Sequence, residues 1–183
     1  MAYIKLNNKL PGIVGLLAYR PETAKPMNEL AEILLRGEST LTSAEREMIA
    51  SYVSYQNECH FCHSSHGAAA AHHLDGNLDL MDDIKAGFKK TEISSKLRAL
   101  LNIAKNVQEM GNRVSEDDIE NARKVGATDR EIHDTVLIAA AFCMFNRYVD
   151  GLGTWAPQDK DAYDDMGKML AHEGYGKTDY SKL

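Results

Sequence analysis

The sequence REMIASYVSYQNECHFCHSSHGAAA, residues 46–70, contains two helical patterns separated by a short polar break. Just before it, Thr42-x-x-Glu45 has the form of a capping box, in which two side chains satisfy backbone N–H groups at a helix start. Apolar side chains follow at helical spacing at Met48, Ile49, Tyr52 and Val53. The polar residues 56–58 interrupt this pattern, and a second helix is predicted from there to about Leu74.

Helical patterns continue along the rest of the chain. N-terminal helices are predicted within residues 11–37, and a C-terminal helix at 159–173. The helices predicted between them cover residues 78–88, 93–110, 115–125 and 128–149. Strand-like alternation does not persist anywhere, and no linker rich in Gly, Pro or Ser divides the chain. The sequence therefore predicts an all-α helical bundle, a single domain of residues 1–183 with its core at about 42–153.

Two segments of the chain are similar to each other. They are LTSAEREMIASYVSYQNECHFC, residues 41–62, and GATDREIHDTVLIAAAFCMFNR, residues 126–147. Both have a cap, an acidic first turn and a long apolar face, so they are either pseudo-symmetric partners or two helices that begin alike. In the second segment we expect Cys143 to be a buried apolar side chain. Asn146 and Arg147 are expected to end the helix and cap it, rather than to reach the active site or a subunit interface.

Composition narrows the class of protein. The 183 residues are 44% hydrophobic and 26% charged, which is typical of a globular chain. The net charge of −6, without any basic patch, argues against binding to nucleic acid. The longest apolar run is the ten residues 136–145, whereas a membrane span needs roughly 20. The N-terminus is a poor signal peptide and three cysteines are an odd number for a disulfide framework, so we expect a cytoplasmic protein.

Chemically reactive side chains concentrate in residues 58–74, which hold two of the three cysteines and five of the seven histidines. A helix turns about 100° per residue, so Cys59, Cys62 and His66 would share one face. A thiol reacts as its thiolate, which a helix N-terminus or a neighbouring histidine favours. The helix start favours Cys59 as the nucleophile and the histidine favours Cys62, so the residues alone leave this choice open. The small side chains of 68–71 would let another helix or a substrate approach closely.

Three other interpretations of this region compete with a redox site. A structural zinc site needs four ligands, and no second Cys-x-x-Cys or His-x-x-x-His pair follows. A redox sensor without turnover, or a pair of buried cysteines among solvated histidines, would also fit the composition. Upstream, Glu45 and Glu47 lie in the first turns of their helix, where solvated carboxylates are common.

Glu47 precedes Cys59 by twelve residues, which completes the pattern Glu-x11-Cys-x-x-Cys-x-x-x-His. This pattern and the flanking residues 46–70 resemble the alkylhydroperoxidases of the AhpD type, in the carboxymuconolactone decarboxylase superfamily. The later segment 114–153 is similar to the peroxidase-related branch of that family, so the resemblance spans most of residues 46–153.

The resemblance implies an all-helical protein that assembles as a trimer or a hexamer and reduces organic hydroperoxides. It implies that Cys62 is the peroxidatic cysteine, that Cys59 resolves it, and that Glu47 and His66 form a proton relay. An external dithiol would restore the pair, and neither a cofactor nor a metal is expected. A further alternative is that the protein is a decarboxylase-like relative within this superfamily and acts on a small organic acid. In contrast to well-known members of the family, this chain has Phe61 where a second relay histidine would stand.

Overall fold

The computed structural model describes residues 2–74, 76–89, 91–177 and 179–180, and within these ranges it contains helices and no strand. The α-helices are α1 Gly12–Tyr19, α2 Pro21–Arg36, α3 Ser43–Gln56, α4 His60–His72, α5 Leu78–Gly87, α6 Ser95–Glu109, α7 Glu116–Lys124, α8 Asp129–Gly151 and α9 Lys160–Glu173, with a 3-10 turn at Gly111–Arg113. The predicted all-α class is therefore confirmed, and most helix ends lie within two residues of the prediction. No described helix has the length and apolar character needed to cross a membrane.

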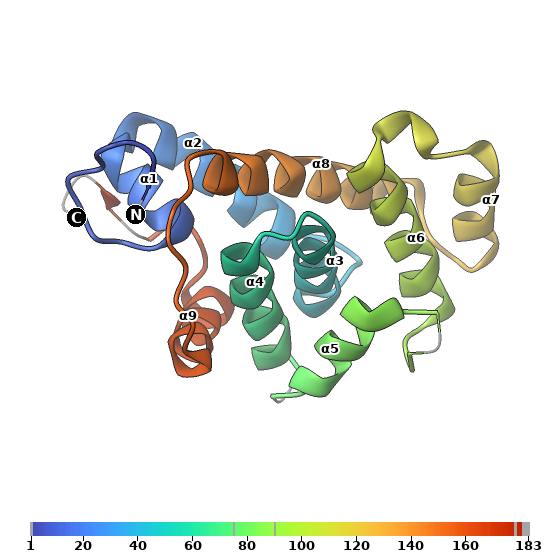
Figure 1. The fold of residues 1–183 in the computed structure, drawn as a ribbon. Helices are drawn as coiled ribbons and strands as arrows, with labels where there is room; N and C mark the ends of the chain where they lie inside the picture. Colours follow the sequence, from blue (N-terminus) through green and yellow to red (C-terminus); the bar gives the residue numbers. More distant parts are fainter. Residues whose placement is uncertain (1, 75, 90, 178, 181–183) are drawn as a thin grey trace.

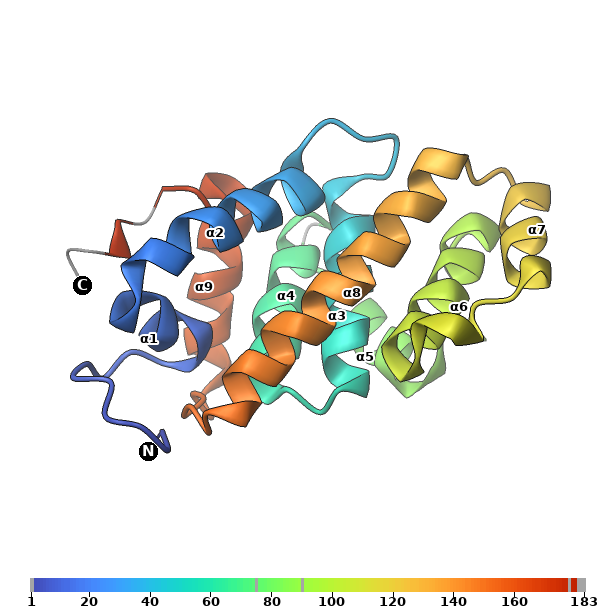
Figure 2. The same cartoon turned by 90° about the horizontal axis from the view of Figure 1, so that it is seen from above.

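Helix α3 lies at the centre of the bundle, with α4 beside it and α8 running across both (Figure 1). Every residue of α3 from 46 to 54 is buried, because other helices surround it. Figure 2 shows α6 and α7 at one end of the molecule and α1, α2 and α9 at the other. The main hydrophobic cluster draws on α2, α3, α5, α6 and α8, and a smaller cluster includes Cys59 and Cys62 at the start of α4.

Helices α4 and α9 pack with their backbones in close approach. An added Cβ at Gly167 of α9 would lie 2.5 Å from the Ala68 side chain and 2.8 Å from the Ala69 backbone nitrogen. The small side chains on both helices therefore allow this contact, as predicted for residues 68–71. As a result, α9 covers the face of α4 that carries the cysteines.

Helices α3 and α8, which belong to the two similar segments, begin alike. Capping boxes form at Thr42 with Glu45 and at Thr128 with Glu131, as the sequence predicts. The segments differ afterwards, because α3 ends at Gln56 whereas α8 continues without a break to Gly151.

The expectation that Asn146 caps α8 is wrong. Asn146 lies inside the helix, is fully buried, and donates to Ser54 Oγ at 3.0 Å while accepting from Asn57 Nδ2 at 2.8 Å. It therefore connects α8 to α3, a role that depends on packing between distant segments. Cys143, expected to be buried, is half-buried, with the Asn57 amide 3.5 Å from its sulfur.

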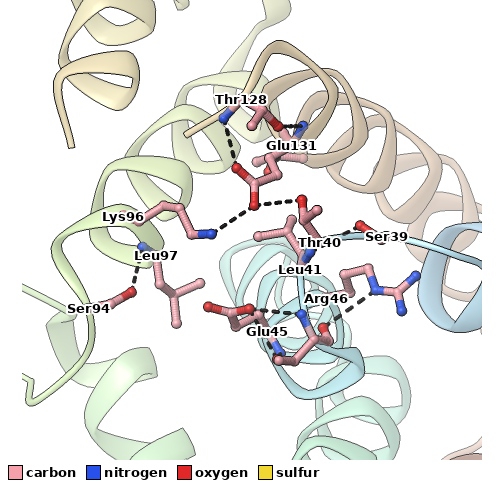
Figure 3. A network of polar contacts seen from close by, with 12 residues as sticks. Ser39, Thr40, Leu41, Glu45, Arg46, Ser94, Lys96, Leu97, Thr128 and Glu131 are labelled. Carbon is pink, nitrogen blue, oxygen red and sulfur yellow. Dashed lines mark hydrogen bonds and ion pairs between the residues drawn. The ribbon is translucent and has the colours of Figure 1, made fainter. Parts of the chain in front are cut away.

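The carboxylate of Glu131 links three parts of the fold (Figure 3). It accepts from Lys96 Nζ at 2.7 Å, from Thr40 Oγ1 at 2.8 Å and from the Thr128 backbone N–H at 2.7 Å. Burial of Glu131 opposes ionisation, but the hydrogen bonds from Lys96, Thr128 and Thr40 outweigh it and lower its pKa to about 2. The pKa of the group in the unfolded chain is 4.5.

We therefore expect the stabilisation from Glu131 to depend on pH. A lowered folded-state pKa means that the stabilisation is complete above pH 4.5 and is lost as the pH falls towards 2. In urea titrations, the difference in free energy of unfolding between the wild type and Glu131→Gln should shrink by about 2 kcal/mol from pH 7 to pH 3. Glu29→Gln, which alters an exposed carboxylate, serves as the control and should show no such trend. A constant difference for Glu131→Gln would contradict the prediction.

Candidate active site

The two cysteines lie at the start of α4, in different backbone conformations. Cys59 is not in the helix, contrary to the expectation that it shares a helical face with Cys62 and His66, because it is the extended N-cap residue that precedes α4. The turn before it includes Glu58 at φ 60°, and the Cys59 N–H donates to Ser54 O at 3.0 Å. This tight turn reverses the chain from α3 and directs Cys59 towards the first turn of α4, where Cys62 lies.

Both thiols are free and buried: Cys59 is 0% exposed and Cys62 is 4% exposed. A side-chain hydrogen bond with Cys62, followed by burial, raises the pKa of Cys59. Cys59 therefore holds its proton more tightly than an ordinary thiol. The start of a helix favours a thiolate, but at Cys59 the hydrogen bond with Cys62 and burial have the larger effect on the pKa.

His66 lies one turn of α4 beyond Cys62 and is paired with Glu47 of α3. The His66 Nδ1–H donates to Glu47 Oε2 at 2.8 Å, and Glu47 is 0% exposed. Phe142 of α8 packs edge-on against the imidazole, with ring centroids 4.6 Å apart. With Nδ1–H held by the carboxylate, the neutral ring keeps Nε2 as a proton acceptor. The structure thus brings together Glu47 and His66, which lie 19 residues apart in sequence.

A mostly apolar cavity of about 110 Å³ opens on this arrangement. Cys62, Ser65 and His66 of α4 form one wall of the cavity. The other walls come from α1, α2, α8 and α9, and include Val14, Leu17, Met27, Phe145, Met166 and Met169. A cavity of 150 Å³ with such a lining can bind benzene, so this one has room for a small apolar group.

Sequence reasoning missed one residue of the site, Tyr175. Its hydroxyl donates to Glu47 Oε1 at 2.5 Å, and its ring stacks on His66 with centroids 5.9 Å apart. The residue lies in the polar C-terminal segment, where no helical pattern or motif marks it. An aromatic residue shortly after the last helix is the only signal the sequence offers, and this signal does not indicate a contact with Glu47.

The other histidines of the motif region lie away from the cavity wall. His60 and His63 contact each other and face a separate, open pocket with Tyr163. Burial, followed by the charge of Lys85, lowers the pKa of His63 to about 4. His72 contacts Asp164 Oδ1 at 2.9 Å. Among the described residues, no group of three or more His, Cys, Asp or Glu is arranged to hold a metal ion.

Fold and site together define an all-helical protein with a buried Cys-x-x-Cys pair beside a Glu–His pair. The sequence matches the carboxymuconolactone decarboxylase family over residues 21–75. A solved structure from Ralstonia eutropha JMP134, an uncharacterized peroxidase-related protein with an alkylhydroperoxidase AhpD core, is 30% identical. Its TM-score is 0.76, with 87% of this chain and 82% of that chain covered. The chain therefore belongs to the carboxymuconolactone decarboxylase family and is similar to its AhpD-like, peroxidase-related members.

Two further solved structures have a similar fold. An uncharacterized peroxidase-related protein from Silicibacter sp. TM1040 is 28% identical, with a TM-score of 0.75 and coverage of 84% of this chain and 78% of that chain. A protein of unknown function from Agrobacterium tumefaciens shares the fold at 21% identity, with a TM-score of 0.69 and coverage of 79% of this chain and 97% of that chain. A search of curated proteins finds no match.

Proposed function

We propose that this protein reduces small organic hydroperoxides with the Cys59–Cys62 pair. The observation that carries the proposal is that Cys62, one thiol of a buried pair, and His66, which is bonded to Glu47, line the same apolar cavity. An apolar lining favours a hydroperoxide with an alkyl or aryl group over hydrogen peroxide, because it desolvates that group at little cost. The likeness to AhpD-like, peroxidase-related proteins supports the same reaction class.

The proposed first step oxidises Cys62. His66 Nε2 accepts the thiol proton, and the Cys62 thiolate attacks the outer oxygen of the hydroperoxide. The O–O bond breaks, an S–O bond forms, and the leaving alkoxide takes the proton back from His66 to depart as an alcohol. Cys62 becomes a sulfenic acid, and the hydroperoxide has been reduced by two electrons.

In the second step, the Cys59 thiol attacks the sulfenic sulfur of Cys62. The S–O bond breaks, a disulfide forms and water leaves. An external dithiol then reduces the disulfide by exchange and becomes oxidised itself, which returns both thiols. The raised pKa of Cys59 fits its role as the thiol that stays protonated while Cys62 reacts.

Single-turnover reaction with cumene hydroperoxide tests the assignment of the two cysteines. Cys62→Ser should lose peroxide consumption, because the nucleophile is gone. Cys59→Ser should consume one equivalent and stop at a sulfenic acid that dimedone traps on Cys62. Cys143→Ser, which alters a half-buried thiol on α8, should behave like the wild type. Consumption by Cys62→Ser at the wild-type rate would overturn the proposed function.

The same samples separate the alternatives left open by the sequence. A decarboxylase-like activity would survive alkylation of the thiols, whereas the proposed peroxidase activity would not. Stoichiometric zinc in protein purified without a histidine tag, together with unreactive thiols, would favour a metal-binding role. Reduction by an external dithiol, cytoplasmic localisation and assembly into a trimer or hexamer remain predictions.

A further inference from the structure

The chain after α9 turns back onto α2 and is held there by two side chains. Arg36 Nη1 donates to the backbone oxygens of Leu170 and Ala171, the last-turn carbonyls of α9, at 3.2 and 2.5 Å. Glu32 Oε2 accepts from the Tyr175 backbone N–H at 2.7 Å. These bonds fix both the end of α9 and the backbone of Tyr175 relative to α2.

Gly174 makes this turn possible. Its φ of +81° lies in the left-handed region, which residues with a Cβ rarely adopt. An added Cβ would also lie 2.5 Å from Glu32 Oε2 and 2.8 Å from Arg36 Nε, the groups that hold the segment. The path of the chain into Tyr175 therefore depends on a glycine at this position.

The phenol of Tyr175 completes the hydrogen bonding of a buried carboxylate. Glu47 Oε1 accepts from the Tyr175 hydroxyl at 2.5 Å, while Oε2 accepts from His66 Nδ1 at 2.8 Å. Burial of the phenol, followed by the negative charge of Glu47, raises the pKa of Tyr175 well above its usual value. The hydroxyl therefore stays protonated at neutral pH and remains a donor. Bonds of this kind, from a hydroxyl to a carboxylate, are short and strong.

We propose that Tyr175 is a positioning residue of the Glu47–His66 relay. Its hydroxyl keeps the buried carboxylate oriented towards His66 Nδ1, so that Nε2 stays free to accept a proton. Its ring is stacked on the imidazole, with centroids 5.9 Å apart, and so restricts the movement of His66. The C-terminal segment thereby supplies a polar group to a relay that has Phe61 where a second histidine would stand. This inference rests on the proposed function of the same site.

Tyr175→Phe tests the role of the hydroxyl, because phenylalanine keeps the ring. Without the donor, the Glu47 carboxylate is no longer held towards His66 Nδ1. An imidazole that loses this acceptor is free to carry its proton on Nε2, where it can no longer accept one from Cys62. We expect Cys62 to be alkylated by iodoacetamide on the order of tenfold more slowly at pH 7, with the midpoint of the pH profile moved to higher pH. Mass mapping identifies Cys62 as the labelled residue.

Two further variants make the result specific. Tyr52→Phe removes the hydroxyl of a buried tyrosine in α3, and it should leave the pH profile of alkylation unchanged. Gly174→Ala retains the phenol but displaces it, and should shift the midpoint in the same direction as Tyr175→Phe. A variant that changed only the access of iodoacetamide to Cys62 would alter the alkylation rate at every pH and leave the midpoint of the pH profile where it is. A Tyr175→Phe profile identical to that of the wild type would overturn the inference.

Alkylation involves no peroxide, so the two proposals can fail separately. If Cys62→Ser still consumes hydroperoxide while Tyr175→Phe shifts the alkylation midpoint, the proposed function is wrong and the positioning role of Tyr175 stands. If Cys62→Ser is inactive and the Tyr175→Phe midpoint does not move, the proposed function stands and Tyr175 is not part of the relay.

Discussion

Glu47→Gln is expected to slow the oxidation of Cys62 by a hydroperoxide by about 10²-fold or more. Glutamine has nearly the same shape, but its amide can donate a hydrogen bond to His66 Nδ1 where the carboxylate accepts one. The imidazole then carries its proton on Nε2 and can no longer accept one there. The same change of tautomer inactivates catalytic triads when their aspartate is replaced by asparagine. Stopped-flow measurement of thiol oxidation in a single turnover gives the rate.

Glu45→Gln is the matched control for this variant. Glu45 lies two residues earlier on α3, in the capping box with Thr42, and glutamine also serves at that position. We therefore expect wild-type rates for Glu45→Gln and wild-type circular dichroism spectra for both variants. Rapid oxidation of Cys62 in a folded Glu47→Gln variant would show that the thiol ionises without the relay.

Gly167→Leu is expected to separate α9 from α4. The added side chain would begin 2.5 Å from the Ala68 Cβ and 2.6 Å from the Ala68 backbone, so the helices must move apart. The free energy of unfolding should fall by about 2 kcal/mol or more, although leucine favours a helix over glycine by about 1 kcal/mol. Tyr163 and Met166 of α9 pack on the cysteines, so the same movement should speed alkylation of Cys62 across the whole pH range.

Gly151→Leu is the control that separates the effect of packing from the effect of helix propensity. Gly151 is exposed at the last turn of α8, and an added Cβ there meets no atom within 4 Å. This variant should be as stable as the wild type or slightly more stable, with unchanged alkylation of Cys62. If Gly167→Leu unfolds at the same urea concentration as Gly151→Leu, the contact between α4 and α9 is not as tight as the structure indicates.

The helices could be predicted from the sequence because the signals for them are local. Thr42 with Glu45 and Thr128 with Glu131 form capping boxes within four residues of chain, and the structure contains both. The apolar spacing along α3 and α8 likewise reports a preference that each segment has by itself. The small side chains at 68–71 indicated a close approach, although they did not identify Gly167 of α9 as the partner.

The part of the candidate site that lies within one short motif could be predicted from the sequence. The resemblance to the AhpD type implied that Glu47, Cys62 and His66 share a site, and the structure places Glu47 and His66 in hydrogen-bonding contact. The helical-face argument failed for Cys59, because a helix cap next to a positive-φ residue has a different geometry from a helix interior. Periodicity assumes a regular backbone and cannot locate such an irregularity.

The sequence by itself determined the all-α class, the helix boundaries and the order of the reactive residues on α3 and α4, because these depend on neighbours within a few turns of chain. Only the tertiary structure decided what surrounds those residues. Tyr175 reaches Glu47 across 128 residues, and α9 and α1 bury thiols that a motif alone would leave open to solvent. Such contacts depend on how distant helices pack, which local propensity does not encode. The hydrogen bond with Cys62 and burial raise the pKa of Cys59, and burial raises that of Tyr175, so the packing influences the chemistry that the site can perform.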